Sequence, residues 1–247
     1  MGKRIFVFGD AHGCVDELRM LLDCVQFSGN DRLISAGDLI DRGPSPVGVI
    51  QLLRSLGGEG VMGNHEEKAL RYRRHSAKRA ENPNYVNPMG VQHPDRLKQW
   101  NAIPDEDWDW LAFRPKFIHI NKWWTVVHGG CEPGIDVELQ KENVLMRMRY
   151  YDTAKKKMVS PTPSGGRPDS CHHWSDIWDG ERKIVYGHYT FDDVKVTHNT
   201  LGIDTGCYSG GPLTAAEFNE DNDQYKIHQV ASGKVYHPRR WGNDAEE

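Results

Sequence analysis

Short apolar runs alternate with amphipathic stretches over the first third of the chain. Continuous β-rich runs at residues 4–8 and 32–36 predict two buried strands, and a shorter run at 60–62 predicts a third. Between these runs, apolar residues recur at helical spacing over residues 15–25 and again after Pro46, a residue type that often begins a helix. This β-α-β-α-β order predicts parallel strands with helices packed on the sheet.

The rest of the chain is less regular. Residues 68–79 predict a helix whose Lys and Arg side chains form a solvated face, and residues 105–112 predict a shorter helix. Residues 80–104 are rich in Asn, Pro and His, which predicts a loop-dominated insertion or cap. Further strands are predicted at residues 116–120, 123–127, 183–186 and 202–203.

These patterns predict one domain over residues 1–236. Insertions are expected at residues 75–115 and 152–182, where the strand and helix signals are weak. The stretch from residue 237 to 247 is predicted to be a polar tail.

Composition excludes several classes of protein. The 247 residues carry 31 Lys and Arg against 35 Asp and Glu, and this formal charge of −4 excludes a generally basic nucleic-acid coat. No apolar run approaches the roughly 20 residues of a membrane-spanning helix, and the start MGKRIFVFGD reaches an acidic residue too early for a signal peptide. The five cysteines form no CxxC pair, which favours a reduced protein. We therefore expect a cytoplasmic location.

Polar turns follow the strands of this predicted fold. Six strand candidates end in turns rich in Gly, Asp, His and Asn, at residues 9–13, 37–38, 63–66, 128–130, 187–188 and 204–206. Ligands of open α/β sheets bind at the carboxyl ends of strands, so these turns should converge. Asp, His and Asn without thiolate suit Mn²⁺, Fe or Zn²⁺. Asp38 could bridge two ions, an arrangement suited to in-line attack on phosphorus.

Each turn alone has an ordinary structural explanation. Asp10 and Asp38 could cap helices, and a buried histidine at a strand end is more often structural than a ligand. The segment 37–44 is different, because Asp38, Asp41 and Arg42 follow an apolar strand within five positions. The ordered set of turns therefore favours a chemical site.

The five blocks at residues 9–13, 37–43, 63–66, 128–130 and 187–188 resemble GDxHG, GDxxDRG, GNHE, HGG and GH of the calcineurin-like metallophosphoesterases. More narrowly, they resemble the serine/threonine phosphoprotein phosphatase superfamily, in its compact bacterial and phage branch of the phage lambda protein phosphatase type. The resemblance runs from about residue 3 to 217 and is weak in both insertions. It implies an α/β fold with a central β-sandwich of mixed sheets, flanked by helices and carrying surface insertions.

The resemblance also implies two divalent metal ions, Mn²⁺ being the first expectation and Fe or Zn²⁺ the alternatives. Asp10 and His12 would hold the first ion, and Asp38 would bridge both. The second ion would be held by Asn64, His128 and His188, and Asn64 would also contact the substrate phosphate.

Catalytic and phosphate-binding roles follow from the same resemblance. Arg42 would bind the phosphate through its guanidinium fork. His65 would be the general acid, held and charged by Asp41, a pairing expected to raise the imidazole pKa. A second phosphate-binding arginine would be Arg147, which is in register, or Arg149, although the family's usual Trp is missing here.

The leading functional prediction is hydrolysis of phosphomonoesters by metal-activated hydroxide, nominally in phosphoserine or phosphothreonine protein. A dinucleoside polyphosphate hydrolase, acting on diadenosine tetraphosphate, is an alternative, although symmetrical tetraphosphatases usually carry Gln where this chain has His12. A nucleotide or RNA-end phosphatase or phosphodiesterase, and a non-catalytic metal-binding scaffold, are further alternatives. Expected partners are a phosphorylated protein or a small phosphoester or nucleotide. We expect no membrane partner, and we expect nucleic acid only as a substrate. The sequence leaves the oligomeric state open.

Overall fold

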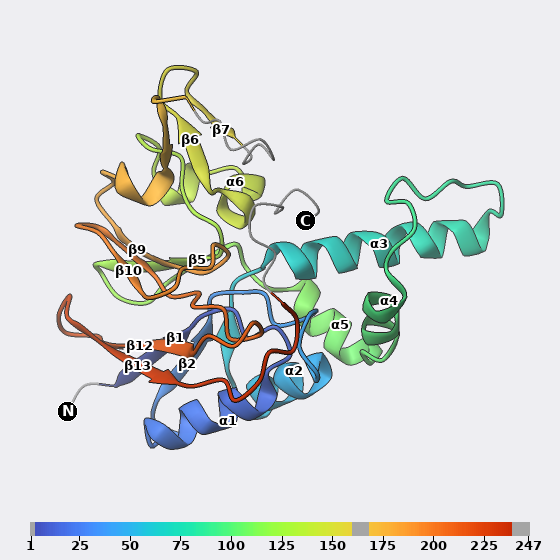
Figure 1. Cartoon of the computed structure of the whole chain (residues 1–247), viewed down its shortest axis with the longest axis horizontal. Coiled ribbons are helices and arrows are strands. Elements are labelled where there is room, and N and C mark those ends of the chain that lie inside the picture. Colours follow the sequence, from blue (N-terminus) through green and yellow to red (C-terminus); the bar gives the residue numbers. More distant parts are fainter. Residues whose placement is uncertain (1–2, 160–167, 239–247) are drawn as a thin grey trace.

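Two stacked β-sheets form the centre of the molecule, with helices against their outer faces (Figure 1). The structure, a computed structural model, describes residues 3–159 and 168–238. Each of the two sheets has five strands and mixes parallel with antiparallel pairs. The predicted fold class, a sandwich of mixed sheets flanked by helices, is therefore confirmed.

The first sheet has the strand order β13-β12-β1-β2-β3. Its strands are β1 (Arg4–Phe8), β2 (Arg32–Ser35), β3 (Glu59–Gly60), β12 (Leu213–Asn219) and β13 (Tyr225–Val230). The predicted parallel arrangement of β1, β2 and β3 is confirmed, although β3 is shorter and begins one residue earlier than expected. The antiparallel strands β12 and β13, which no sequence pattern predicted, extend the sheet beyond β1.

The second sheet has the order β10-β11-β9-β5-β4. Its strands are β4 (Phe117–His119), β5 (Trp124–Val127), β9 (Lys183–Tyr186), β10 (Lys195–Val196) and β11 (Thr200–Gly202). The strand predicted at 202–203 lies two residues earlier, so that Asp204 falls in the turn that follows. Parallel pairing of β5, β9 and β11 brings their carboxyl ends to one edge.

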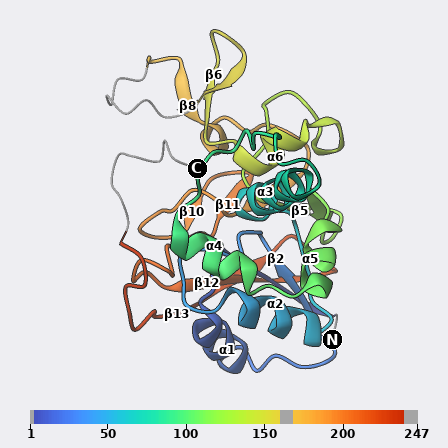
Figure 2. The ribbon, with the colours of Figure 1, turned by 90° about the vertical axis from the view of Figure 1, so that its right-hand side faces the viewer.

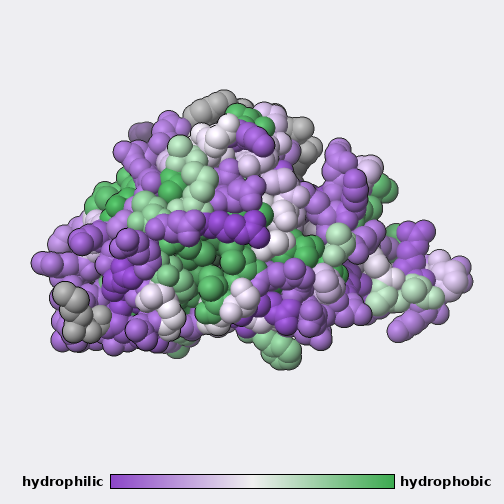
Figure 3. All heavy atoms as spheres, turned by 90° about the horizontal axis from the view of Figure 1, so that it is seen from below, coloured by the Kyte–Doolittle hydropathy of each residue, from purple (hydrophilic) through white to green (hydrophobic). Residues whose placement is uncertain are grey.

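Apolar side chains from both sheets fill the space between them. Ile5 and Val7 from the first sheet pack in one buried cluster with Val126 and Val185 from the second. On the outer face of the first sheet, α1 (Val15–Cys24) and α2 (Pro46–Ser55) bury a second cluster. Seen from below, the surface is largely hydrophilic, with apolar side chains gathered near its middle (Figure 3).

The first insertion is more helical than the sequence indicated. Helix α3 (Asn64–Glu81) is followed by α4 (Pro94–Asn101) and α5 (Asp105–Ala112), and α3 projects from the body with α4 beneath it (Figure 1). The prediction of a loop-dominated segment over 80–104 is therefore wrong for α4. This helix has only eight residues, and Trp100 is its buried residue. One buried apolar residue gives no helical periodicity that the sequence could show.

The second insertion carries a small sheet of its own. Strands β6 (Tyr150–Asp152), β7 (Lys157–Val159) and β8 (Cys171–His173) are ordered β7-β6-β8, and they lie between α6 (Glu142–Arg147) and the short helix η2 (Trp174–Asp176). Another short helix, η1 (Val137–Leu139), precedes α6. Most of the predicted tail lies outside the described residues. Within those residues, no helix has both the length and the apolar character needed to cross a membrane.

Candidate metal and phosphate site

The polar turns meet at one edge of the sandwich, as the strand pattern predicted. The backbone N–H of His12 donates to the Asp38 carbonyl at 2.9 Å, which ties the turn after β1 to the turn after β2. The N–H of Gly187 donates to the His128 carbonyl at 3.0 Å, which ties the turns after β9 and β5. The backbone N–H of His188, after β9, also donates to the carboxylate of Asp10, after β1, so both sheets supply residues to a single site.

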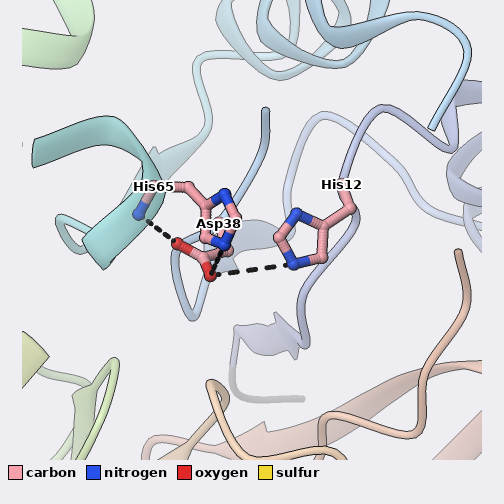
Figure 4. Close-up of side chains that lie close together, drawn as sticks. All are labelled: His12, Asp38 and His65. Carbon is pink, nitrogen blue, oxygen red and sulfur yellow. Dashed lines mark hydrogen bonds and ion pairs between the residues drawn. The ribbon is translucent and has the colours of Figure 1, made fainter. Parts of the chain in front are cut away.

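Asp38 lies at the centre of this site. Its Oδ2 is 3.3 Å from Nε2 of His128 and 3.7 Å from Nε2 of His12, while its Oδ1 accepts the backbone N–H of His65 at 3.0 Å. Figure 4 shows one oxygen of this carboxylate in contact with ring nitrogens of both His12 and His65. Two groups of donors share it: His12, Asp38 and His65 form one, and Asp38, His128 and His188 form the other, with donor atoms within 4.8 Å of one another in each.

Asp10 belongs to neither group among the described residues. Its carboxylate instead accepts the backbone N–H of His188 at 3.0 and 3.1 Å. Burial, and then the nearby Asp204 and Asp38 carboxylates, raise the pKa of Asp10 well above its usual range. A bound cation would offset the repulsion between these buried carboxylates and stabilise their charged form.

The histidines of the second group also fit a cation. His128 Nδ1 lies 2.8 Å from the Ala36 carbonyl, which assigns a proton to Nδ1 and turns Nε2 toward the oxygens of Asp38 and Asn64, the latter at 2.8 Å. Burial lowers the pKa of His128, but Asp38 outweighs it and the net pKa is raised. His188 Nδ1 is buried and has no hydrogen-bond partner among the residues that the structure describes. A cation could replace the proton between His128 and Asp38.

The backbone at the site adopts an unusual conformation. Five site residues have φ between 40° and 67°, in the left-handed region: His12, Asp38, Asp41, Arg42 and His188. Non-glycine residues in this region cost of order 1 kcal/mol or more each. The surrounding turns therefore hold the site in a conformation that short peptides would avoid.

Glu66 is a buried residue that sequence reasoning missed. Its carboxylate accepts the backbone N–H groups of Asp38 at 3.0 Å, Leu39 at 2.8 Å, Ile40 at 3.2 Å and Gly63 at 3.1 Å. Burial and then Asp38 raise the pKa of Glu66 to about 7. The sequence signal was available, because Glu66 ends the GNHE block, but its role is to fix the turn that presents Asp38.

His65 and Asp41 form the predicted pair, with Nδ1 of His65 2.6 Å from Oδ2 of Asp41. Two residues of α4 also contact this carboxylate, and neither was predicted. The indole N–H of Trp100 donates to Oδ1 at 2.7 Å, and Nε of Arg96 lies 3.2 Å from Oδ2. The first insertion therefore contacts the site directly.

The predicted rise in the pKa of His65 is wrong as a net effect. Burial lowers the pKa of His65 and Arg42 lowers it further, whereas Asp38 and Asp41 act in the opposite direction. The net pKa lies below its ordinary value. Asp41 therefore raises the pKa of His65, as predicted, but burial of the imidazole lowers this pKa by more.

Arg42 lies over the ring of Tyr208, with its guanidinium carbon 4.4 Å from the ring centroid. One of its nitrogens is 3.2 Å from Nε2 of His12. This stacking orients a planar, bidentate donor at the edge of the first donor group. Tyr208 was not among the predicted site residues, because nothing in its sequence neighbourhood indicates which side chain it supports.

The two remaining arginine candidates lie in different places. Arg149 is buried and its Nε donates to Nε2 of His188 at 3.0 Å. Arg147, at the end of α6, donates to Glu67 at 2.5 Å and is partly exposed. The structure thus brings Arg149, and not the in-register Arg147, into contact with the donor groups.

Known proteins resemble this chain over most of its length. The family profile described as calcineurin-like phosphoesterase matches residues 3–233. A symmetrical bis(5′-nucleosyl)-tetraphosphatase from Nitrosospira multiformis is 28% identical and aligns with 94% of this chain and 98% of its own length. The asymmetrical bis(5′-nucleosyl)-tetraphosphatase PrpE from Oceanobacillus iheyensis is 27% identical, over 88% of this chain and 89% of its own.

Solved structures also resemble the chain. A crystal structure provisionally assigned as a diadenosine tetraphosphatase has a TM-score of 0.74 and 30% identity, over 94% of both chains. A protein serine/threonine phosphatase from Saccharomyces cerevisiae has a TM-score of 0.57 at 15% identity, over 96% of this chain and 82% of its own. The second likeness concerns the fold alone.

Proposed function

This chain belongs to the calcineurin-like phosphoesterase family, and we propose that it hydrolyses dinucleoside polyphosphates, diadenosine tetraphosphate being the first substrate to test. Relatives that align over nearly their whole length carry tetraphosphatase names, both symmetrical and asymmetrical. This supports the sequence-based alternative over the leading prediction of a phosphoprotein substrate, for which the phosphatase neighbour offers a shared fold only.

One observation carries the proposal: Asp38 is shared by two donor groups, and an arginine lies beside each group. Arg42 contacts His12 of the first group, and Arg149 contacts His188 of the second. Paired cation sites with guanidinium groups on both sides suit a substrate that is a chain of charged phosphates.

The donor groups fit two divalent ions. Buried carboxylates gather at the site, and Nδ1 of His188 has no hydrogen-bond partner among the described residues. His12 and Asp38 of the first group would hold one ion, and Asp38, His128 and His188 of the second group would hold the other. Asp10, which accepts the N–H of His188, would complete the first site, and Asn64, 2.8 Å from His128, would complete the second. Mn²⁺ is our first expectation because the donors are carboxylate, imidazole and amide without thiolate. When bound, the ions would activate the attacking water and neutralise phosphoryl oxygens.

The side chains of the chain itself perform the remaining steps. Arg42 and Arg149 would orient the phosphoryl oxygens that do not react. His65 turns Nδ1 to Asp41, so its Nε2 faces the site and would donate a proton to the leaving oxygen. In a dinucleoside tetraphosphate the leaving group is a nucleotide phosphate, which is less basic than an alkoxide and needs that proton less.

The same pair favours a second candidate function, phosphomonoester hydrolysis. An imidazole held by a buried carboxylate at 2.6 Å is most useful when the leaving group is a basic alkoxide, as in phosphoserine. Both activities could occur at one site.

A substrate panel with added Mn²⁺ tests the proposal. We expect kcat/KM for diadenosine tetraphosphate to exceed that for a phosphoserine peptide, with products resolved by chromatography as two ADP or as AMP and ATP. Asp38→Asn, measured for metal content by elemental analysis, is the control for site-dependent turnover. A higher kcat/KM for the phosphopeptide, lost in Asp38→Asn, would instead establish the second candidate.

A further inference from the structure

A cavity of about 450 Å³ lies between α3, α4 and α5, which pack together on one side of the molecule (Figure 2). Its walls include the rings of Tyr72, Trp100 and Trp108, and the Tyr72 and Trp100 ring centroids are 5.4 Å apart. Ser76 of α3 adds a hydroxyl group to the wall. The cavity therefore combines flat apolar surfaces with a polar group, as small-molecule sites do.

The cavity lies along the side of α3 that carries His65 at its start. His65, Ala69, Tyr72 and Ser76 are spaced at i, i+4, i+7 and i+11, which places them on one face of the helix. With a rise of about 1.5 Å per residue, Tyr72 lies about 10 Å along the axis from His65. Trp100 belongs to the cavity wall and also donates to Asp41 at 2.7 Å.

We propose that this cavity binds the nucleoside of the leaving nucleotide, a reading that rests on the proposed function for the identity of the ligand. His65 protonates the leaving oxygen, so the leaving nucleotide extends from the reacting phosphorus on the side of His65. The phosphates and ribose of ADP would span the distance along α3, and the base would then reach the aromatic walls. Trp100 and Trp108 are buried, so Tyr72, which is partly buried, offers the ring for stacking. Such stacking suits every base because each has a π-face.

Two cations lie near the start of α3. Lys68 is half-buried one turn into the helix, and Nε of Arg96, from α4, lies 3.2 Å from Oδ2 of Asp41. Burial, and then the neighbouring Arg96, lower the pKa of Lys68. Under this proposal, Lys68 and Arg96 would contact the phosphates of the leaving nucleotide, whereas the other α3 cations keep the predicted solvated face.

Charged and aromatic groups line the outer part of the cavity. The guanidinium of Arg73 lies 5.3 Å from the centroid of Trp108 and donates to Asp105 at 2.6 Å. The cavity volume of about 450 Å³ lies within the range of small-molecule pockets, which favours a single nucleoside over a nucleic-acid strand as the occupant.

Inhibition by ADP and by pyrophosphate tests the proposal on the metal-loaded full chain, with p-nitrophenyl phosphate as the reporter substrate. Both inhibitors carry a diphosphate, and only ADP carries a nucleoside. We expect ADP to inhibit the wild type more strongly than pyrophosphate, and Ser76→Trp, which fills the cavity, to weaken ADP inhibition about 10-fold relative to pyrophosphate. The ratio of the two constants cancels any general loss of activity. Arg74→Trp, on an exposed side of α3, is the matched control.

An unchanged ratio in Ser76→Trp, with a melting temperature like that of Arg74→Trp, would overturn the cavity as a nucleoside site. Equal inhibition of the wild type by ADP and pyrophosphate would overturn it as well. If Ser76→Trp does not fold, Tyr72→Leu, which removes one ring of the cavity wall, takes its place. The ratio of the ADP and pyrophosphate inhibition constants is then expected to change in the same direction. Failure of the wild type to cleave diadenosine tetraphosphate would refute the proposed function, and it is measured separately from the ADP ratio.

Discussion

Gly187 allows the turn after β9 to approach Asp10, and its replacement by alanine tests how tightly the site is built. A Cβ at this position would lie well inside 3.0 Å of Asp10 Oδ1, a separation below which such contacts essentially do not occur. The backbone cannot easily retreat, because the N–H of Gly187 donates to His128 and the next N–H, that of His188, donates to Asp10. The carboxylate of Asp10 must therefore yield.

The required displacement is about 1 Å, and a misplacement of that size in a catalytic group typically costs about 10²-fold in rate. We expect Gly187→Ala to lose about two orders of magnitude in kcat and to bind less than the wild-type complement of Mn²⁺. Overpacking should also destabilise the fold by about 1–3 kcal/mol, which lowers the melting temperature by a few degrees.

Elemental analysis of the purified variant, turnover of p-nitrophenyl phosphate and a thermal melt measure these three effects. Gly29→Ala is the control, because a Cβ there has no atom within 4 Å and should leave all three unchanged. If Gly187→Ala keeps full activity and full metal content, then Asp10 is not needed where the structure places it, and its assignment to the metal site is refuted.

Three further predictions follow from other contacts. His65→Asn should reduce turnover of a phosphoserine peptide by roughly 10²–10⁴-fold and that of p-nitrophenyl phosphate much less, and an equal loss on both would exclude His65 as the general acid. Arg149→Ala should weaken competitive inhibition by inorganic phosphate about 10–100-fold, because Arg149 contacts His188. Arg147→Ala should weaken it much less, because Arg147 pairs with Glu67 instead. A larger effect of Arg147→Ala would restore Arg147 as the second phosphate-binding arginine. Asp31→Asn should cost about 1 kcal/mol at about pH 7 in a urea melt, because burial raises the pKa of Asp31 but its hydrogen bonds with Arg4 and Ser28 together outweigh burial and lower the pKa below 3.8. That difference should shrink as the pH falls below 3.8 and through the lowered pKa of Asp31, where the wild-type carboxylate is protonated. A difference that persists once Asp31 is protonated would contradict its origin in the charged carboxylate.

Much of the site could be predicted from sequence because its residues follow strands directly. Asp10, Asp38 and His128 each stand a few positions after a run of buried apolar residues, so strand prediction alone places them at a common edge. Trp100 and Arg96 could not be found this way. They reach Asp41 from a helix more than fifty positions along the chain, and their sequence surroundings resemble a polar surface loop.

The choice between Arg147 and Arg149 shows a second limit. Register alone favoured Arg147, but α6 ends at this residue and the chain then becomes extended at Met148. This change of conformation at the helix end leaves Arg147 beside Glu67 and carries Arg149 into the buried site. The strands β12 and β13 were missed for a related reason: β12 contains Thr, Ala and Glu, and its place in the sheet depends on pairing with β1.

The left-handed backbone at five site residues has an evolutionary consequence. If each of these residues costs about 1 kcal/mol, their summed cost is about 5 kcal/mol. That cost is comparable to the whole free energy of unfolding of a domain at the lower end of the typical range, about 5–15 kcal/mol. A duplicated copy released from selection for catalysis would gain stability by accepting glycine at these positions, since glycine adopts this conformation freely. Active members of a lineage descended from this chain should therefore be less stable than their inactive paralogues, and the difference should map to these turns.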